Sequence, residues 1–190
     1  MTSSVVECLA ALDPTTNPKG QKNANIVRDG SQAFWLISSP VQPLWQPSAF
    51  KGVSGDATGR LSLCLMGTAD VLAEATALDA WAVDYAFQHS ERLFGKALTK
   101  DQVSDRYNSV LKKADKYPSY IKVKLGTERN APKYWDESKQ PRDAPTDFMA
   151  CSLQCQLRIV SLWFMNTSFG LTVQLQNAQV VSEHAQICPF

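Results

Sequence analysis

Residues 153–181 read LQCQLRIVSLWFMNTSFGLTVQLQNAQVV, and this stretch decides the fold. Apolar side chains recur at every second position, as they do on a strand with one buried face. They are Leu153, Cys155, Leu157, Ile159 and Trp163 in the first half, and Phe169, Leu171, Val173 and Leu175 in the second. Between the halves, Asn166, Thr167 and Ser168 favour a turn. The pattern predicts a β-hairpin of two long strands.

The opposite face of this hairpin is polar and carries no acid. Its side chains are Gln154, Gln156 and Arg158 on the first strand and Thr172, Gln174 and Gln176 on the second. Such a face can lie against a polyanion or a neutral partner without charge repulsion. Gly170 lies inside the second strand, and a glycine there indicates a bulge or the close approach of another segment.

Charge is unevenly distributed along a chain that is nearly neutral overall. The 190 residues are enough for one domain, and the formal net charge is +1. Residues 100–142 contain eleven Lys/Arg and six Asp/Glu, a local net charge of +5. Residues 69–94 contain one Arg and five Asp/Glu, a local net charge of −4. We therefore expect one basic and one acidic side if the fold keeps these segments apart.

Cysteine usage and hydropathy indicate a soluble, intracellular protein. Five cysteines in a chain of this length are too few, and odd in number, for a disulfide framework. Cys151 and Cys155 share one face of the first hairpin strand, which favours core packing. The start of the chain does not resemble a signal peptide, and no apolar run reaches the roughly 20 residues that cross a bilayer.

The remainder of the chain divides into an arm, a domain and a tail. Residues 1–30 contain Pro14, Pro18, Gly20 and Gly30 and are predicted to form a mobile arm, with a short helix near residues 5–12. Residues 31–182 form the domain, with further strands near residues 32–38, 61–66 and 120–125. A helical insertion occupies residues 69–117, a polar loop residues 127–145, and a C-terminal tail residues 183–190.

Two helices are expected in the insertion. The first begins near Asp70 and carries apolar residues at helical spacing, and the second begins at Thr99 and ends before Pro118. Five strands and two helices predict a mainly β protein, an OB-fold-like five-stranded antiparallel barrel with inserted helices. An open α+β sheet with the helices on one face is the alternative.

No arrangement of residues indicates catalysis, a metal or a cofactor. His89 and His184 have no Cys, His or carboxylate at ligand spacing and are expected on the surface. Residues 52–55 contain two glycines but lack the Lys-Ser/Thr of a phosphate-binding loop. Asp79 and Asp84 are five residues apart on the first helix and do not share a face. We therefore predict a protein that is not an enzyme.

Basic residues interleave with aromatic ones in two groups. The first group is Lys112, Lys113, Lys116, Tyr117, Tyr120, Lys122 and Lys124; the second is Arg129, Lys133, Tyr134, Trp135, Lys139 and Arg142. Cations follow the phosphates of single-stranded nucleic acid and aromatic rings stack on its bases. Trp35, Trp45 and Lys51 lie on or near a proline-rich extended segment and join this set, whereas Trp81 and Trp163 are expected in the core.

Three segments resemble a family of virus- and phage-encoded single-stranded DNA-binding proteins. They read KYPSYIKVKL (residues 116–125), IVSLWFMN (159–166) and FGLTVQLQ (169–176). In that family a lysine-rich Y-P-x-Y-hydrophobic-K strand precedes a W-F/I-x-N-x-x-F-G-L hairpin. The resemblance covers residues 32–182 and includes the proteins of large DNA viruses. It implies an OB fold and sequence-independent binding during replication, recombination or repair.

We therefore predict a single-stranded DNA-binding protein without catalytic residues. The predicted binding residues are Trp35, Trp45, Lys51, Lys116, Tyr120, Lys122, Lys124, Arg129, Lys133, Tyr134, Trp135 and Arg158. A protein-interaction or virion structural protein is the alternative, followed by an RNA-binding protein on the same fold. Replication-type relatives often end in an acidic tail with a terminal aromatic residue. This chain ends Ile187-Cys188-Pro189-Phe190 with only Glu183 acidic nearby, so recruitment of replication proteins by the tail is in doubt, and an oligomer is possible.

Overall fold

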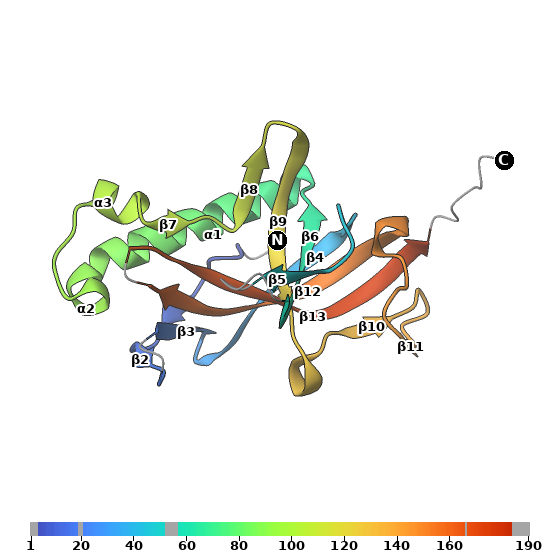
Figure 1. The fold of residues 1–190 in the computed structure, drawn as a ribbon, viewed down its shortest axis with the longest axis horizontal. Helices are drawn as coiled ribbons and strands as arrows, with labels where there is room; N and C mark the ends of the chain where they lie inside the picture. Colours follow the sequence, from blue (N-terminus) through green and yellow to red (C-terminus); the bar gives the residue numbers. More distant parts are fainter. Residues whose placement is uncertain (1–3, 19–20, 52–56, 166, 184–190) are drawn as a thin grey trace.

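The structure is a computed structural model that describes residues 4–18, 21–51, 57–165 and 167–183 (Figure 1). The first half contains β1 (Leu9–Ala11), β2 (Thr15–Thr16), β3 (Lys22–Arg28), β4 (Ser31–Val41), β5 (Ser48–Lys51), β6 (Ala57–Met66), α1 (Ala69–Gln88) and α2 (Ser90–Phe94). The second contains α3 (Lys100–Ser104), β7 (Tyr107–Asn108), β8 (Leu111–Ala114), β9 (Tyr117–Leu125), β10 (Lys133–Trp135), β11 (Pro141–Arg142), β12 (Cys151–Phe164) and β13 (Phe169–Glu183). Two 3₁₀ turns, η1 (Glu128–Asn130) and η2 (Phe148–Ala150), lie between these strands.

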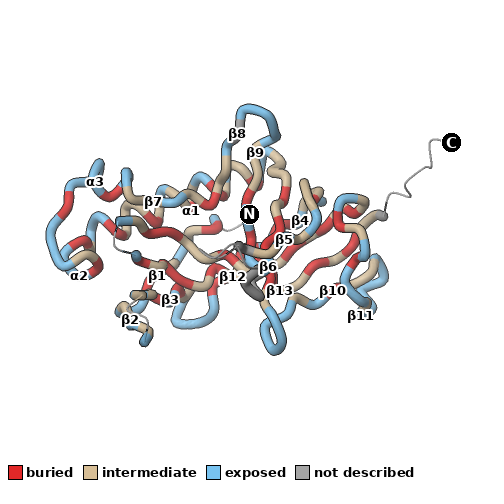
Figure 2. Tube along the Cα trace, in the orientation of Figure 1, coloured by how far each residue is buried: buried red, intermediate tan, exposed pale blue. Residues whose placement is uncertain are grey.

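The predicted hairpin is confirmed and forms the centre of the sheet. β12 and β13 pair antiparallel along their whole length, from Cys151 opposite Glu183 to Phe164 opposite Phe169. Burial alternates from Cys151 to Ser161 of β12, which confirms the predicted inward side chains up to Ile159, and Figure 2 shows alternating colours along the strand. Beyond Ser161 the prediction is wrong, because Leu162 and Phe164 are buried and Trp163 is half-buried. Three irregularities in the register bend the pair. Asn166 of the predicted turn lies outside the described residues.

The sheet is open and mixed, which corrects the five-stranded barrel. The strand order is β1-β3-β4-β12-β13-β9-β6-β5, and β1 and β5 at its two ends do not pair with each other. β13 pairs in parallel with β7, β9 and β10 in turn, so the sheet is not purely antiparallel. The mainly β class with inserted helices is confirmed. The architecture agrees with an OB-like protein only at this coarse level.

The first predicted helix is confirmed, and most of the second is wrong. α1 buries Val71, Ala75, Leu78, Ala82 and Ala86 along one stripe. α3 begins with a capping box between Thr99 and Gln102 but ends at Ser104. The chain then forms β7 and β8. Asp79 of α1 accepts hydrogen bonds from the amides of Val110 (2.8 Å) and Leu111 (3.3 Å), and so holds this segment extended.

The N-terminal arm and the polar loop also correct the sequence prediction. Residues 5–12 form a turn and β1 instead of a helix, and β3 pairs with both β4 and β12. Ala24 and Ile26 of β3 are buried, so this segment is part of the sheet. In the loop at residues 127–145, β10 pairs in parallel with β13. Residues 184–190 of the predicted tail lie outside the described residues.

Trp35 connects the sheet to α1 and belongs to the core. Ala33, Trp35 and Ile37 of β4 face inward, and Trp35 is 1% exposed. Its indole Nε1 donates a 2.6 Å hydrogen bond to the carboxylate of Glu74 on α1. The predicted exposure of Trp35 is therefore wrong, because its side chain supports the packing of helix on sheet.

Candidate nucleic-acid interface

The outer face of β9 carries a row of basic residues. Ile121, Val123 and Leu125 are buried, so Tyr120, Lys122 and Lys124 project from the other side of the strand. Lys122 lies opposite Cys64 and Lys124 opposite Ser62, both on β6. On β13, the hydroxyl of Thr172 accepts a 3.4 Å hydrogen bond from the ammonium of Lys124. We call Lys116, just before the strand, together with Tyr117, Tyr120, Lys122 and Lys124 the β9 track; all of them are exposed except Tyr120, which is half-buried.

The β8–β9 hairpin adds cations at the start of this track. Figure 1 shows the hairpin projecting from the body of the molecule. Lys112 of β8 lies opposite Tyr120, and Lys113 and Lys116 are exposed near the turn. These lysines were predicted at the end of a helix but lie on a strand and its turn. Partial burial lowers the pKa of Lys112, and Lys122 lowers it further, while Asp79 acts in the opposite direction.

Trp45 packs against the two tyrosines of the track. Trp45 contacts the rings of Tyr117 and Tyr120 edge to face, with centroid separations of 5.2 Å and 5.3 Å. Trp45 is half-buried, whereas 52% of Tyr117 is exposed. Tyr117 belongs to the first basic and aromatic group of the sequence but is not among the predicted binding residues. The local sequence pattern does not indicate that Trp45 contacts both tyrosine rings.

The short strand β10 pairs with β13 and has side chains on both of its faces. Lys133 is exposed and Trp135 half-buried on one side, and Tyr134 is buried on the other. The indole of Trp135 donates a 3.2 Å hydrogen bond to the Asn177 side chain, which donates in turn to Gln156 at 2.7 Å. Trp135 therefore lies over the amide-rich face of the β12–β13 hairpin.

Tyr134 is not on the exposed loop that the sequence predicted. It is 7% exposed and packs edge to face against Phe148, with centroids 5.9 Å apart. Its backbone lies beside Ala178 in the parallel pairing with β13. Burial raises the pKa of Tyr134 to about 12, so its hydroxyl keeps its proton at neutral pH.

The other predicted binding residues lie on several different elements. Arg158 is half-buried and lies between Phe34 of β4 and Gln174 of β13. Arg129 is exposed in η1, between the end of β9 and the start of β10. Lys51 ends β5, but its side chain lies outside what the structure describes. Along the chain, the β9 track is thus followed by Arg129 in η1 and then by Lys133 and Trp135 in β10.

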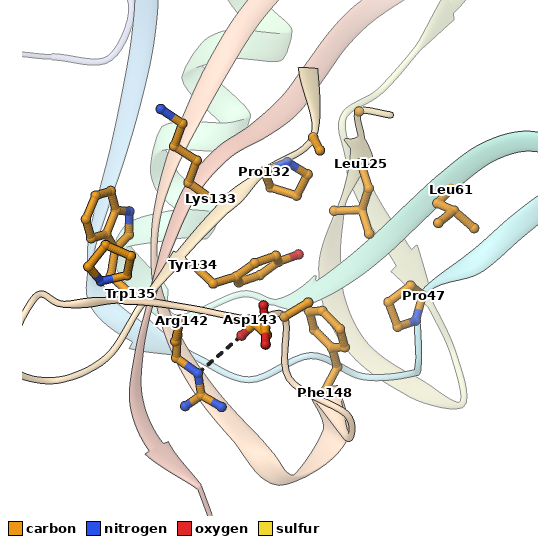
Figure 3. Close-up of a pocket in the computed structure, with 14 residues that line it drawn as sticks. Pro47, Leu61, Leu125, Pro132, Lys133, Tyr134, Trp135, Arg142, Asp143 and Phe148 are labelled. Atoms are coloured by element: carbon orange, nitrogen blue, oxygen red, sulfur yellow. Dashed lines mark hydrogen bonds between the residues drawn. The ribbon is translucent and has the colours of Figure 1, made fainter. Parts of the chain in front are cut away.

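An open hollow of about 640 Å³ lies where β6 and β9 meet β10 (Figure 3). Its walls include Leu61, Leu125 and Phe148, with the ring of Tyr134 extending between them. Pro47, Pro132 and Pro141 also line it, together with Lys133 and Arg142. The Arg142 Nε donates a 3.3 Å hydrogen bond to the carbonyl of Asp143, drawn as a dashed line in the figure.

Within the described part of the chain, the side chains do not form a metal site. No group of three or more His, Cys, Asp or Glu residues there could hold an ion. The same residues contain no helix with the length and apolar character needed to span a membrane. The arrangement on the sheet is therefore one of cations, amides and aromatic rings.

The fold is similar to those of two phage proteins of known structure. One is a single-stranded DNA-binding protein from bacteriophage Enc34 in complex with single-stranded DNA (TM-score 0.50, 11% identity, 90% of this chain and 91% of that chain covered). The other is gp2.5, a single-stranded DNA-binding protein encoded by bacteriophage T7 (TM-score 0.52, 10% identity, 84% and 91% covered). No protein-family model matches the chain, and no curated protein sequence matches it significantly. The likeness at these identities concerns the fold alone.

Proposed function

We propose that this protein binds single-stranded DNA without regard to sequence and without catalysing a reaction. The observation that carries the proposal is the β9 track, in which exposed Lys122 and Lys124 follow an aromatic cluster at the start of the same strand. From Tyr117 to Leu125 this strand is about 26 Å long, at roughly 3.3 Å per residue. That length suits several nucleotides of an extended strand.

The chemistry of the face explains how both parts of a nucleic-acid strand would be held. Lys116, Lys122 and Lys124 would neutralise phosphates and release their counterions. Tyr117, Tyr120 and Trp135 would stack on bases, an interaction that every base can make. The neighbouring glutamines of β12 and β13 add no negative charge that would repel the backbone.

The comparisons support the proposal through the fold. The Enc34 protein was solved in complex with single-stranded DNA, and the T7 protein is also described as a single-stranded DNA-binding protein. Both come from phages, one of the two sources in the sequence resemblance. The large-virus part of that resemblance, a role in replication or recombination, and recruitment by the tail stay predictions.

The test is a titration of the full chain, followed by tryptophan fluorescence, with oligo-dT, a mixed-sequence strand, duplex DNA and RNA. We expect similar affinity for the two single DNA strands and weaker binding to duplex. Affinity should fall linearly with salt on logarithmic axes. Equal or tighter binding of RNA would favour the RNA-binding alternative. A chain that binds none of the four would contradict the proposal and favour a protein-interaction role.

A further inference from the structure

A row of side chains crosses four neighbouring strands on one side of the sheet. Side chains that lie opposite each other in the register of paired strands project from the same side. Phe34 of β4 lies opposite Arg158 of β12, Arg158 opposite Gln174 of β13, and Gln174 opposite Lys124 of β9. All four are exposed or half-buried, whereas the residues before and after each of them in the sequence are buried. We call these four residues the crossing row, which shares its side of the sheet with Lys122 of the β9 track.

A second row of side chains runs beside the crossing row. Leu36 of β4 lies opposite Gln156 of β12, Gln156 opposite Asn177 of β13, and Asn177 beside Lys133 of β10. Both rows begin with an apolar residue on β4, continue over polar side chains and end with a lysine on a strand parallel to β13. Neither row contains an acid, so the face that they share does not repel a polyanion.

The crossing row starts where the lysine strand joins the central hairpin. β13 pairs with β9 at Gln174 and Leu175, and the ammonium of Lys124 donates a hydrogen bond to Thr172 of β13 at the same place. Neighbouring strands are roughly 4.8 Å apart, so Arg158 lies about 10 Å and Phe34 about 14 Å across the sheet from β9. A nucleic-acid strand held at Lys124 therefore comes within reach of β4 after a short crossing.

The β4 end of the two rows is an uncovered apolar pair. Leu36 is 66% exposed and Phe34 is half-buried. They are two residues apart on one strand, about 7 Å at roughly 3.4 Å per residue. α1 packs on the other side of β4, where the indole of Trp35 bonds to Glu74, and so does not cover this pair. An aromatic ring beside an aliphatic side chain offers a base an apolar surface.

Arg158 supplies a positive charge beside this apolar pair. It is half-buried and forms no hydrogen bond or ion pair with another residue that the structure describes. A guanidinium in this position is complementary to a phosphate next to a stacked base. An apolar protein segment would cover Phe34 and Leu36 but would leave the guanidinium without an opposite charge.

We infer that the bound strand leaves the β9 track at Lys124 and crosses the sheet to β4, where one base stacks on Phe34 against Leu36. Arg158 would contact the phosphate that precedes or follows this base. The inference rests on the proposed function and deepens it, because it assigns Phe34 and Leu36 to an interface that the sequence placed on other residues.

The first test removes the aromatic ring of Phe34 but keeps an apolar side chain. Phe34→Leu and the control Phe87→Leu are titrated with oligo-dT and with a strand of equal length made wholly of abasic nucleotides. Phe87 is 40% exposed on α1, on the opposite side of β4. We expect Phe34→Leu to weaken binding of oligo-dT about tenfold, as for one lost stack. Its affinity for the abasic strand, and both affinities of Phe87→Leu, should stay unchanged.

The two strands separate failure of the inference from failure of the proposed function. Unchanged binding of oligo-dT by a folded Phe34→Leu variant shows that no base reaches β4, although the proposed function then stands. Equal weakening for both strands shows that the ring supports the sheet instead of stacking, which also overturns the inference. A parent chain that binds neither strand removes the proposed function and the crossing with it.

The charge in the middle of the crossing row is tested by the salt dependence of binding. Arg158→Gln should lower the slope of affinity against salt, on logarithmic axes, by about one unit. Lys96→Gln removes the same charge from the exposed loop between α2 and α3 and should leave the slope of the parent. An unchanged slope for Arg158→Gln would show that the strand does not pass over β12.

A measurement on the parent chain does not depend on any variant folding. Oligo-dT carrying one 5-iodouracil at successive positions is cross-linked by light, and the modified peptides are identified by mass spectrometry. We expect cross-links to Phe34 from a different position of the strand than those to Tyr117 or Tyr120. Cross-links to the two tyrosines without any to Phe34 would overturn the inference.

Discussion

Gly170 shows how one residue fixes the geometry of the central hairpin. It lies opposite Trp163 in the register of β12 and β13. A Cβ atom placed on Gly170 would approach Trp163 Cζ2 to 2.8 Å and the Asn108 carbonyl to 2.9 Å. The glycine therefore allows the indole of one strand and the backbone of β7 to approach the same point. Trp163 is half-buried and lies over this point. Its spacing in the sequence predicted that it would lie in the core.

Gly170→Val should destabilise the fold by about 1–3 kcal/mol, the usual cost of overpacking a fitted site. Both neighbours would have to move, and one of them is backbone. Gln176→Val on the same strand is the control, since Gln176 is half-buried on the polar side and should change stability by no more than about 0.5 kcal/mol. Urea unfolding of the parent and the two variants measures the difference. Equal midpoints for all three would show that Gly170 is replaceable.

Trp135→Ala should reduce binding more than stability. Loss of a base stack should cost about 1–3 kcal/mol of binding to single-stranded DNA. The folded protein loses partial packing and one hydrogen bond to Asn177, worth about 1 kcal/mol. Trp35→Ala should do the reverse, because truncating a buried tryptophan costs about 3–5 kcal/mol of folding free energy. Normal binding together with a large loss of stability in Trp135→Ala would exclude Trp135 from the interface.

The burial of Trp35 could not be predicted from the sequence around it. Near Trp35 the sequence reads QAFWLIS, with large apolar residues on both parities. Periodicity therefore does not say which of Phe34, Trp35 and Leu36 faces inward. In the structure, 66% of Leu36 is exposed, whereas Trp35 is buried and its indole donates a hydrogen bond to Glu74 of α1. Such a contact between distant segments leaves no mark in a local pattern.

Asp79 is the clearest case of one residue determining an element. Its carboxylate accepts hydrogen bonds from the backbone amides of Val110 and Leu111. It also accepts hydrogen bonds from the hydroxyl of Tyr107, at 2.7 Å, and from the hydroxyl of Ser109. Burial and the neighbouring Asp79 raise the pKa of Tyr107. The carboxylate thus holds β7 and β8 against α1.

Asp79→Ala should cost about 2–4 kcal/mol of folding free energy, because it leaves amides near buried Val110 without their acceptor. Asp84→Ala on the same helix is the control. Asp84 pairs with Lys100 at 2.6 Å, but both side chains are about half exposed, and such pairs contribute roughly 0–1 kcal/mol. Urea unfolding at neutral pH compares the two. A loss no larger than that of Asp84→Ala would show that β8 forms without this anchor.

Elements with one clear period could be predicted from the sequence, and those set by distant partners could not. Burial alternates along most of β12 and along β9 from Tyr120 to Leu125, and α1 repeats apolar residues over twenty positions. Residues 105–116 have a similar helical spacing of apolar residues. They do not form a helix, because the amides of Val110 and Leu111 donate to the Asp79 carboxylate and β8 pairs with β9. In β3, the alternation of Ala24 and Ile26 was short and lay among prolines and glycines that favoured an arm.

At the scale of the molecule, basic residues gather along one strand although the net charge is only +1. Binding should therefore depend on the β9 track and not on the total charge. Lys122→Ala should weaken binding to all sequences alike and lower the salt slope by about one unit. Lys96→Ala, an exposed lysine between α2 and α3, is the control and should leave the slope unchanged. If both variants gave the slope of the parent, Lys122 would not contact a phosphate.

The strand order also constrains how the molecule folds. β1, β3 and β4 form one half of the sheet and β9, β6 and β5 the other, and the path between them runs only through β12 and β13. These two are the last strands of the described chain, so each half keeps an unpaired edge until they arrive. Contacts between residues far apart in the sequence slow folding, and unpaired edges invite aggregation. Refolding watched by stopped-flow tryptophan fluorescence should accordingly take milliseconds to seconds. During translation, a chaperone would have the longest access to the edges of β4 and β9.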